Sequence, residues 1–183
     1  GCISSEPELT MENIRSLDFG VIGEGDETIV ELVEKIQTNA EDYNSVDGII
    51  FRNAGQLVKT NSRKPIEDLD SLPYPDYEGF DISYYIERQT LIDLDSSPND
   101  NPKVFEIAAS RSCPFKCTFC FHPVGQKYRK RSINSVISEI KYLVDNYGIN
   151  YLLINDELLA NNKKWISEFC IKIKELNIKW QAQ

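Results

Sequence analysis

Three of the five cysteines lie close together in the second half of the chain. They are Cys113, Cys117 and Cys120, in the spacing C-x3-C-x2-C. The apolar run just before them, residues 104–109, is typical of a strand. Three thiols at the end of a strand indicate a metal or cluster site. Three cysteines can hold three corners of a [4Fe–4S] cube, and the fourth iron then keeps an open position that can bind and activate a small molecule.

Other interpretations of the same cysteines remain open. With His122 they form a Cys3His set, which zinc can take as a tetrahedral site. However, His122 follows Cys120 with one residue between them, which is awkward for closing a tetrahedron, and a second pair of ligands at a distance is absent. A disulfide would need a secreted context, of which there is little sign, and buried, inert cysteines are a further alternative. The spacing favours the cluster, and a non-catalytic zinc-binding interaction module is the second hypothesis.

The elements around the cysteines alternate between strand and helix patterns. Ser132 is a suitable helix cap and Gly148 a suitable helix end, with apolar residues at helical spacing between them. The expected elements are strands over 104–109, 149–154 and 178–182, and helices over 132–147 and 163–176. This β-α-β-α-β order predicts the α/β class, with a parallel sheet and right-handed crossovers.

A further cysteine, Cys170, falls in the second of these helices. Ile166, Phe169 and Ile173 recur at helical spacing and define an inward face. Cys170 is predicted to lie on that face as a core residue rather than a ligand, because buried cysteine behaves as a small hydrophobe.

Polar residues follow the second strand of the predicted sheet. Asn155, Asp156 and Glu157 come directly after the run 149–154. In parallel sheets ligands bind at the carboxyl ends of the strands, so these side chains and the cysteines are expected at one edge. The alternative is that they merely end a strand and begin a turn. The shared edge favours a binding role.

Charge is distributed unevenly along the chain. The net charge is −9, yet no Asp or Glu occurs from Ile107 to Ser138. The basic residues of this island are Arg111, Lys116, Lys127, Arg129, Lys130 and Arg131. A solvated basic face and a nucleic-acid patch are both possible interpretations. The position around the cysteines suits a negatively charged cofactor better, and an acidic chain with one basic island predicts no nucleic-acid partner.

The first forty residues predict a short buried strand over 19–23 and a helix ending near Gln37. Ile29, Leu32, Val33 and Ile36 form the expected apolar stripe of that helix. The G-x-G between strand and helix resembles a phosphate-cradling loop, but its acidic residues would repel a phosphate. A tight turn that needs glycine dihedrals is the favoured interpretation.

The middle of the chain predicts connecting structure. Residues 46–60 predict a β-hairpin around the turn Asn53-Ala54-Gly55. Residues 63–77 contain three prolines and predict an ordered linker. Residues 96–102 predict a loop, where a domain boundary is expected.

Length and composition set broad limits on the fold and location. The chain has 183 residues, of which 41% are hydrophobic, so it can bury a core as one large or two small domains. No run of eighteen apolar residues occurs, so no membrane span is expected. The start of the chain lacks the basic and apolar regions of a signal peptide, and a cytoplasmic location is the expectation.

The cysteine triad, with Phe119 directly before Cys120, resembles the signature of the radical S-adenosylmethionine (radical SAM) superfamily. The resemblance implies a [4Fe–4S] cluster held by the three cysteines, with SAM chelating the open iron through its amino and carboxylate groups. An electron from the cluster would then cleave SAM to methionine and a 5′-deoxyadenosyl radical. It also implies that Phe119 and Phe121 lie near the adenine. Asn155, Asp156 and Glu157 occupy the place of the family's acidic motif near SAM.

The resemblance extends beyond the triad to the cobalamin-binding branch of the family. The segments that carry it, in order, are GEGDET (23–28), a hairpin, LDSLPYP (69–75), SRSC (110–113) and YRKRS (128–132). It implies the end of a Rossmann-like cobalamin-binding domain over 1–40. A hairpin and linker would follow over 41–102, and the start of a parallel (β/α) barrel over 103–183.

The chain departs from the family pattern in its extent. It holds about two and a half β/α units of the barrel, and it lacks the histidine-bearing loop that ligates cobalt in many members. We therefore expect a fragment of a longer enzyme, inactive as it stands. The resemblance implies methyl transfer, or ring formation or rearrangement, on a small-molecule or natural-product substrate that the sequence does not identify. An electron donor such as flavodoxin or ferredoxin is the expected partner.

Overall fold

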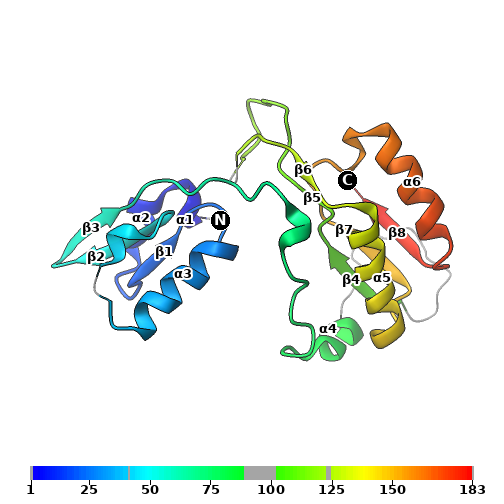
Figure 1. The fold of residues 1–183 in the computed structure, drawn as a ribbon, viewed down its shortest axis with the longest axis horizontal. Helices are drawn as coiled ribbons and strands as arrows, with labels where there is room; N and C mark the ends of the chain where they lie inside the picture. The colour runs from blue at the N-terminus through cyan, green and yellow to red at the C-terminus, as the bar shows by residue number, and fades with distance from the viewer. Residues whose placement is uncertain (1, 41, 89–101, 123–124, 183) are drawn as a thin grey trace. The chain divides into compact units, whose positions relative to one another are not determined.

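A computed structural model of the chain describes residues 2–40, 42–88, 102–122 and 125–182. The chain forms two compact units (Figure 1), the first built from residues 1–67 and 115–126 and the second from 68–114 and 127–183. Residues 68–88 therefore belong with the second unit. Residues 96–101 of the predicted loop, with the boundary expected there, lie outside the described residues.

The second unit contains a parallel three-stranded sheet in the order β4-β7-β8. Its strands are β4 (Val104–Ile107), β7 (Tyr151–Ile154) and β8 (Lys179–Ala182). The helices α5 (Ile133–Tyr147) and α6 (Lys163–Lys174) connect them in turn (Figure 1). The predicted α/β class and β-α-β-α-β order are confirmed, with boundaries that differ by one or two residues at several element ends.

The two helices bury their apolar faces against this sheet. Ser132 caps α5 by accepting a hydrogen bond from the Ser135 N–H at 3.1 Å, and Gly148 ends it with a φ of +66°. The core is built from buried side chains of both helices and of the strands, among them Val136, Ile140, Leu143, Trp165, Phe169, Ile173, Leu152 and Ile154. Apolar β7 is buried on nearly its whole length, as expected for a central parallel strand.

The predicted burial of Cys170 is wrong, because its side chain is exposed. Trp165, Phe169 and Ile173 are buried and follow one another at intervals of four residues. At 3.6 residues per turn this stripe is centred on Phe169, and Cys170 is turned by about 100° from it. Two contacts outside the helix hold this orientation: Phe169 packs edge-on against Trp180 of β8 with ring centroids 5.3 Å apart, and the Trp165 indole N–H donates to the Arg131 carbonyl at 3.0 Å.

The corrected orientation of α6 gives a direct test. Phe169→Ala is expected to lower the free energy of unfolding by about 3–5 kcal/mol, because it leaves a cavity among buried rings. Cys170→Ser is expected to change it by about 0.5 kcal/mol or less. Chemical denaturation followed by circular dichroism measures both. Equal losses in the two variants would contradict the orientation.

The first unit contains an antiparallel sheet in the order β1-β2-β3. Its strands are β1 (Phe19–Val21), β2 (Ile49–Asn53) and β3 (Gln56–Lys59). The predicted hairpin is confirmed, and Asn53 pairs with Gln56, so its turn is Ala54-Gly55. Both turn residues have positive φ, +48° and +82°, as a two-residue type I′ turn requires.

The helix α3 (Asp26–Gln37) is present, but most of its predicted stripe is exposed. Thr28 and Leu32 are buried, whereas Ile29, Val33 and Ile36 are 43–50% exposed. The helix turns the Thr28 and Leu32 side toward the small sheet, where Leu32 packs in the cluster of Val46, Ile49 and Phe51. Likewise only Gly20 of β1 is buried, so this strand is half-buried rather than fully buried as predicted.

Shorter elements complete the described chain. They are α1 (Cys2–Ser5), α2 (Pro7–Asn13), α4 (Ile82–Arg88), the strands β5 (Ser110–Arg111) and β6 (Arg129–Lys130), and the 3-10 turns η1 (Tyr43–Ser45), η2 (Leu69–Ser71) and η3 (Leu159–Asn161). Within the described residues, none of the helices has the length and apolar character needed to cross a membrane.

Candidate cofactor site

The cysteines lie on a loop whose two ends are paired with each other. Strand β5 runs antiparallel to β6, with Ser110 opposite Lys130 and Arg111 opposite Arg129. We call this two-stranded pair the neck, and residues 112–128 the cysteine loop. The neck begins three residues after β4 ends, so the cysteine loop starts at the carboxyl side of the parallel sheet.

The three cysteines differ in exposure. Cys113 is partly buried and belongs to the second unit, while Cys117 and Cys120 are exposed and belong to the segment grouped with the first. The N–H of Cys120 donates to the carbonyl of Cys117 at 3.1 Å, which makes a tight turn between them. Within residues 2–40, 42–88, 102–122 and 125–182, no three His, Cys, Asp or Glu side chains are assembled to hold a metal ion.

The three cysteines are thus not brought together as a ligand set, with or without His122, and their role as ligands stays a prediction. Their chemistry nevertheless fits an iron–sulfur cluster. All three thiols are free of disulfides. The sequence from Ile107 to Ser138 contains no Asp or Glu, so no acidic side chain of this segment would repel negatively charged thiolates.

Aromatic side chains stand out from the cysteine loop. Phe119 is 92% exposed, and Phe115 and Phe121 are more than half exposed. The two rings predicted to lie near an adenine, Phe119 and Phe121, are therefore accessible to a flat ligand. Several exposed aromatic rings on one loop are typical of a surface that binds another molecule.

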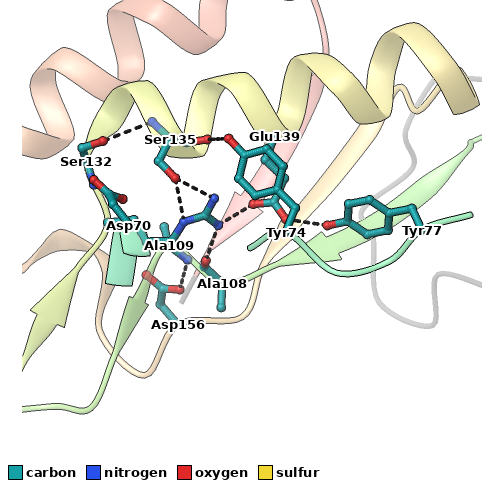
Figure 2. A network of polar contacts seen from close by, with 10 residues as sticks. Asp70, Tyr74, Tyr77, Ala108, Ala109, Ser132, Ser135, Glu139 and Asp156 are labelled. Atoms are coloured by element: carbon teal, nitrogen blue, oxygen red, sulfur yellow. Dashed lines mark hydrogen bonds and ion pairs between the residues drawn. The ribbon is translucent and has the colours of Figure 1, made fainter. Parts of the chain in front are cut away.

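The three polar residues after β7 take two different positions. Asn155 and Glu157 are exposed, and Asn155 contacts the carboxylate of Glu106 through its side-chain amide. Asp156 is only 2% exposed. One of its oxygens accepts a hydrogen bond from the Ala109 N–H at 2.8 Å (Figure 2) and the other accepts from the Ser110 hydroxyl at 2.6 Å. The end of β7 is therefore joined to the start of the neck.

This environment shifts the acidity of Asp156. Burial raises the pKa of its carboxyl, and the hydrogen bonds from Ser110 and Ala109 oppose that shift by favouring the charged form. The positive charge of Arg131 acts in the same direction as these hydrogen bonds.

A second polar cluster, next to the neck, was missed by sequence reasoning. The Arg131 guanidinium donates to the Ser135 hydroxyl at 3.0 and 3.2 Å, to the Ala108 carbonyl at 3.1 Å, and to the buried carboxylate of Glu139. Glu139 also accepts a hydrogen bond from the Tyr77 hydroxyl (Figure 2). Burial and the neighbouring Glu139 carboxylate raise the pKa of Tyr77.

The same cluster attaches the proline-rich segment to the start of α5. Tyr74 donates to the Ser135 carbonyl at 2.9 Å, and Asp70 accepts from the Ser132 N–H at 2.9 Å (Figure 2). Burial alone would raise the pKa of Asp70, but the hydrogen bonds from Ser132 and Ser135 and the charge of Arg131 outweigh it and lower that pKa. A sequence signal existed for Glu139, since it falls at helical spacing within the apolar stripe of α5, where a charge needs a buried partner.

The G-x-G loop before α3 has the features of a turn. Gly23 has a φ of +83°, whereas Gly25 has an ordinary negative φ of −93°. The carboxylate of Glu24 accepts a hydrogen bond from the Ile66 N–H at 2.8 Å. A carboxylate at this position supports the turn interpretation over a phosphate cradle.

Comparison with curated proteins finds relatives along nearly the whole chain. An uncharacterized methyltransferase of Pyrococcus horikoshii is 29% identical over 98% of the chain. The anaerobic magnesium-protoporphyrin IX monomethyl ester cyclase of Cereibacter sphaeroides is 31% identical over 87% of it. The cytidylyl-2-hydroxyethylphosphonate methyltransferase of Streptomyces wedmorensis is 28% identical over 90%. No family model matches the chain.

Solved structures of the same fold carry a more specific description. The cobalamin-dependent S-adenosylmethionine radical enzyme OxsB, with aqua-cobalamin bound, matches the entire chain with a TM-score of 0.67 at 18% identity. The radical SAM methyltransferase TsrM of Kitasatospora setae, with cobalamin and a [4Fe–4S] cluster bound, matches 95% of the chain with a TM-score of 0.60. The chain has the fold of these cobalamin-binding radical SAM enzymes, and its sequence is related to two methyltransferases and a cyclase.

The chain spans only part of the length of these relatives and solved structures. It covers 37% of the Pyrococcus horikoshii protein, 25% of the Cereibacter sphaeroides cyclase and 24% of the OxsB structure. The likeness to solved structures at 18% identity shows the fold. The zinc-binding module hypothesis finds no support among these relatives.

Proposed function

We propose that the chain is part of a radical SAM enzyme that transfers a methyl group with the help of cobalamin. The observation that carries this proposal is the placement of three free thiols on one loop at the carboxyl side of a parallel sheet, in a chain whose relatives include methyltransferases. Cys113, Cys117 and Cys120 would hold a [4Fe–4S] cluster. The cluster, when bound, supplies the electron that cleaves SAM to methionine and a 5′-deoxyadenosyl radical.

The side chains of this chain would bind and orient SAM. The exposed rings of Phe119 and Phe121 offer flat apolar surfaces for the adenine. Asn155 and Glu157 are exposed at the end of β7, where an amide oxygen and a carboxylate can accept hydrogen bonds from an ammonium group. Asp156, the third predicted residue, is buried, and its carboxylate is hydrogen-bonded to Ala109 and Ser110 at the start of the neck.

We further propose a division of the chain that follows the family architecture. Residues 1–40 would be the end of a Rossmann-like cobalamin-binding domain, 41–102 a hairpin and linker, and 103–183 the start of the (β/α) barrel. The parallel order β4-β7-β8 supports the barrel start. The α3 flank formed by Ile29, Val33 and Ile36 is apolar and exposed, which is consistent with a helix taken from a larger domain.

The substrate class is a small molecule with an unreactive carbon. Two relatives are named for small-molecule substrates, a magnesium-protoporphyrin IX monomethyl ester and a cytidylyl-2-hydroxyethylphosphonate, which supports the small-molecule part of this proposal. The cyclase among them makes ring formation the alternative outcome. A one-electron donor of the flavodoxin or ferredoxin type would serve as partner.

The full-length protein tests this proposal. After anaerobic reconstitution with iron and sulfide, incubation with a strong reductant and SAM is expected to yield 5′-deoxyadenosine, measured by liquid chromatography and mass spectrometry. Formation of S-adenosylhomocysteine in the same reaction would report that SAM has given up its methyl group. If neither product rises above the level of a Cys117→Ala control, the proposed function is wrong.

A further inference from the structure

The neck of the cysteine loop is held by side chains from outside the loop. Two residues on each side form the β5–β6 ladder, a pairing too short to be stable on its own in water. Ser110, Ser112 and Arg129 are nevertheless all buried at this point. The stability of the neck must therefore come from what packs and bonds against it.

Asp156 supplies the contact from the neighbouring strand end. It follows β7, and its two oxygens hold the Ala109 N–H and the Ser110 hydroxyl, the residues through which the chain passes from β4 into the neck. The titratable groups facing it are the Arg131 guanidinium and the Tyr128 hydroxyl, which also contacts Ser110. A carboxylate with both oxygens bonded makes two charge-assisted hydrogen bonds in a buried setting, which are among the stronger kinds.

A second contact holds the residue directly before Cys113. Ser112 has a φ of +66°, a left-handed conformation that side chains other than glycine seldom adopt. Its hydroxyl accepts a hydrogen bond from the Arg129 guanidinium at 3.2 Å, and Arg129 also donates to the Lys127 carbonyl at 3.1 Å. The backbone direction at Cys113 is thus set by a conformation that the surrounding contacts maintain.

We propose that Asp156 is a positioning residue that locks the neck and so fixes the direction in which Cys113 leaves the sheet. The clamp made by Asp156 and Ser110 couples the end of one strand to the loop that follows another. This inference rests on the proposed function only in taking Cys113 as a cluster ligand. A pre-set Cys113 would lower the entropy cost of assembling three thiolates around the iron.

The first test uses the full chain without metal, so it does not depend on a cluster. Anaerobic labelling with iodoacetamide, followed by peptide mass spectrometry, gives the rate at which the Cys113 thiol reacts. Asp156→Ala removes both hydrogen bonds and is expected to raise that rate by about 10- to 100-fold, because local opening of the neck becomes easier. The exposed Cys170 thiol is expected to react at an unchanged rate in the same sample.

Two further variants separate positioning from loss of folding. Asp156→Asn keeps one oxygen for the Ala109 N–H and offers an amide to the Ser110 hydroxyl, which can turn to accept. Its Cys113 labelling rate is expected within about 3-fold of the wild type. Ser110→Ala, which leaves the Ala109 bond to Asp156 intact, is expected to give an intermediate rate. Asp145→Asn makes the same chemical change on an exposed carboxylate of α5 and serves as the matched control.

The second test uses the reconstituted full-length protein. The electron paramagnetic resonance spectrum of the reduced cluster is expected to shift or broaden in Ser110→Ala and Asp156→Ala, and to return toward the wild-type spectrum in Asp156→Asn. A structural role unrelated to the loop would not move the spectrum of a folded protein. If the wild type forms no cluster while the labelling rates follow the expected order, the proposed function fails and the clamp stands.

The clamp itself is overturned by a different result. Cys113 labelling that is unchanged in folded Ser110→Ala protein, and equally raised at Cys113 and Cys170 in Asp156→Ala, would show general unfolding rather than release of the neck. An unshifted cluster spectrum in folded Ser110→Ala and Asp156→Ala proteins would equally contradict it.

Discussion

Glu139→Ala is expected to destabilise the second unit by about 3–5 kcal/mol, because it leaves the Arg131 guanidinium without its buried carboxylate. The Glu139 side chain is 3% exposed and that of Arg131 13% exposed. The loss would also release the Tyr77 hydroxyl, which donates to the same carboxylate. Chemical denaturation, with the midpoint and slope fitted separately, measures the change in the free energy of unfolding.

Two milder variants identify the cause of that loss. Glu139→Gln keeps the shape and an acceptor oxygen but removes the charge, so it is expected to cost less than Glu139→Ala. Tyr77→Phe removes one hydrogen bond while the pair with Arg131 remains, and is expected to cost about 1–3 kcal/mol. In the double variant Tyr77→Phe and Glu139→Ala the losses are expected to be less than additive, since both changes remove the same contact.

The outcome has a structural consequence beyond stability. Tyr77 belongs to the proline-rich segment, and Arg131 follows directly on the neck. Glu139 therefore joins the linker, the neck and α5 in one buried network. If Glu139→Ala were as stable as the wild type, this network would have no energetic role, and the account of how the proline-rich segment is held would be wrong.

The order of elements in the second unit was predictable from the sequence, and the reason is physical. An apolar stripe bounded by Ser132 and Gly148 determines where α5 begins and ends, and the alternation of strand and helix patterns favours a parallel sheet. The hairpin was predictable for the same kind of reason, because only a tight turn with glycine joins two runs so close together. Sequence signals suffice to predict an element when the contacts that form it join residues close together in the chain.

The orientation of helices was less predictable. Ile29, Val33 and Ile36 have the spacing of a buried face, but burial depends on which partner the chain brings to that face. The prediction for Cys170 is wrong for a related reason, since the contacts of Phe169 with Trp180 and of Trp165 with the Arg131 carbonyl hold the orientation of α6. Periodicity gives a set of candidate faces, and tertiary packing selects among them.

The candidate site shows the same division between local and long-range information. The cysteine triad was visible in the spacing, whereas the clamp of Asp156 on Ser110 joins residues 46 positions apart and leaves no local pattern. Asp156 was singled out because it follows a strand, on an argument about ligands, and the structure shows its carboxylate bonded to the protein itself. A residue at a strand end can therefore position the loop that carries a site, as well as bind a ligand directly.

Each of the three triad variants, Cys113→Ala, Cys117→Ala and Cys120→Ala, is expected to lose the reconstituted cluster. Three thiolates are the fewest that hold three corners of a cube, so removing any one leaves too few ligands for a stable [4Fe–4S] cluster. The wild type is expected to bind about four irons and four sulfides per chain after anaerobic reconstitution. Iron and sulfide analysis, with the visible absorption of the cluster, measures the difference.

Two other cysteines of the same chain provide matched controls. Cys2 and Cys170 are exposed and free, as Cys117 and Cys120 are, yet they lie outside the cysteine loop. Cys2→Ser and Cys170→Ser are expected to keep the full iron and sulfide content, because exposed thiols elsewhere cannot complete the triad. One tight zinc ion in place of the cluster, or equal iron loss in the control and triad variants, would show that these three sulfurs are not the ligands. Loss of iron in a triad variant is distinguished from loosening of the neck by the cluster's spectrum. A loosened neck would change the spectrum while the iron content stays near that of the wild type.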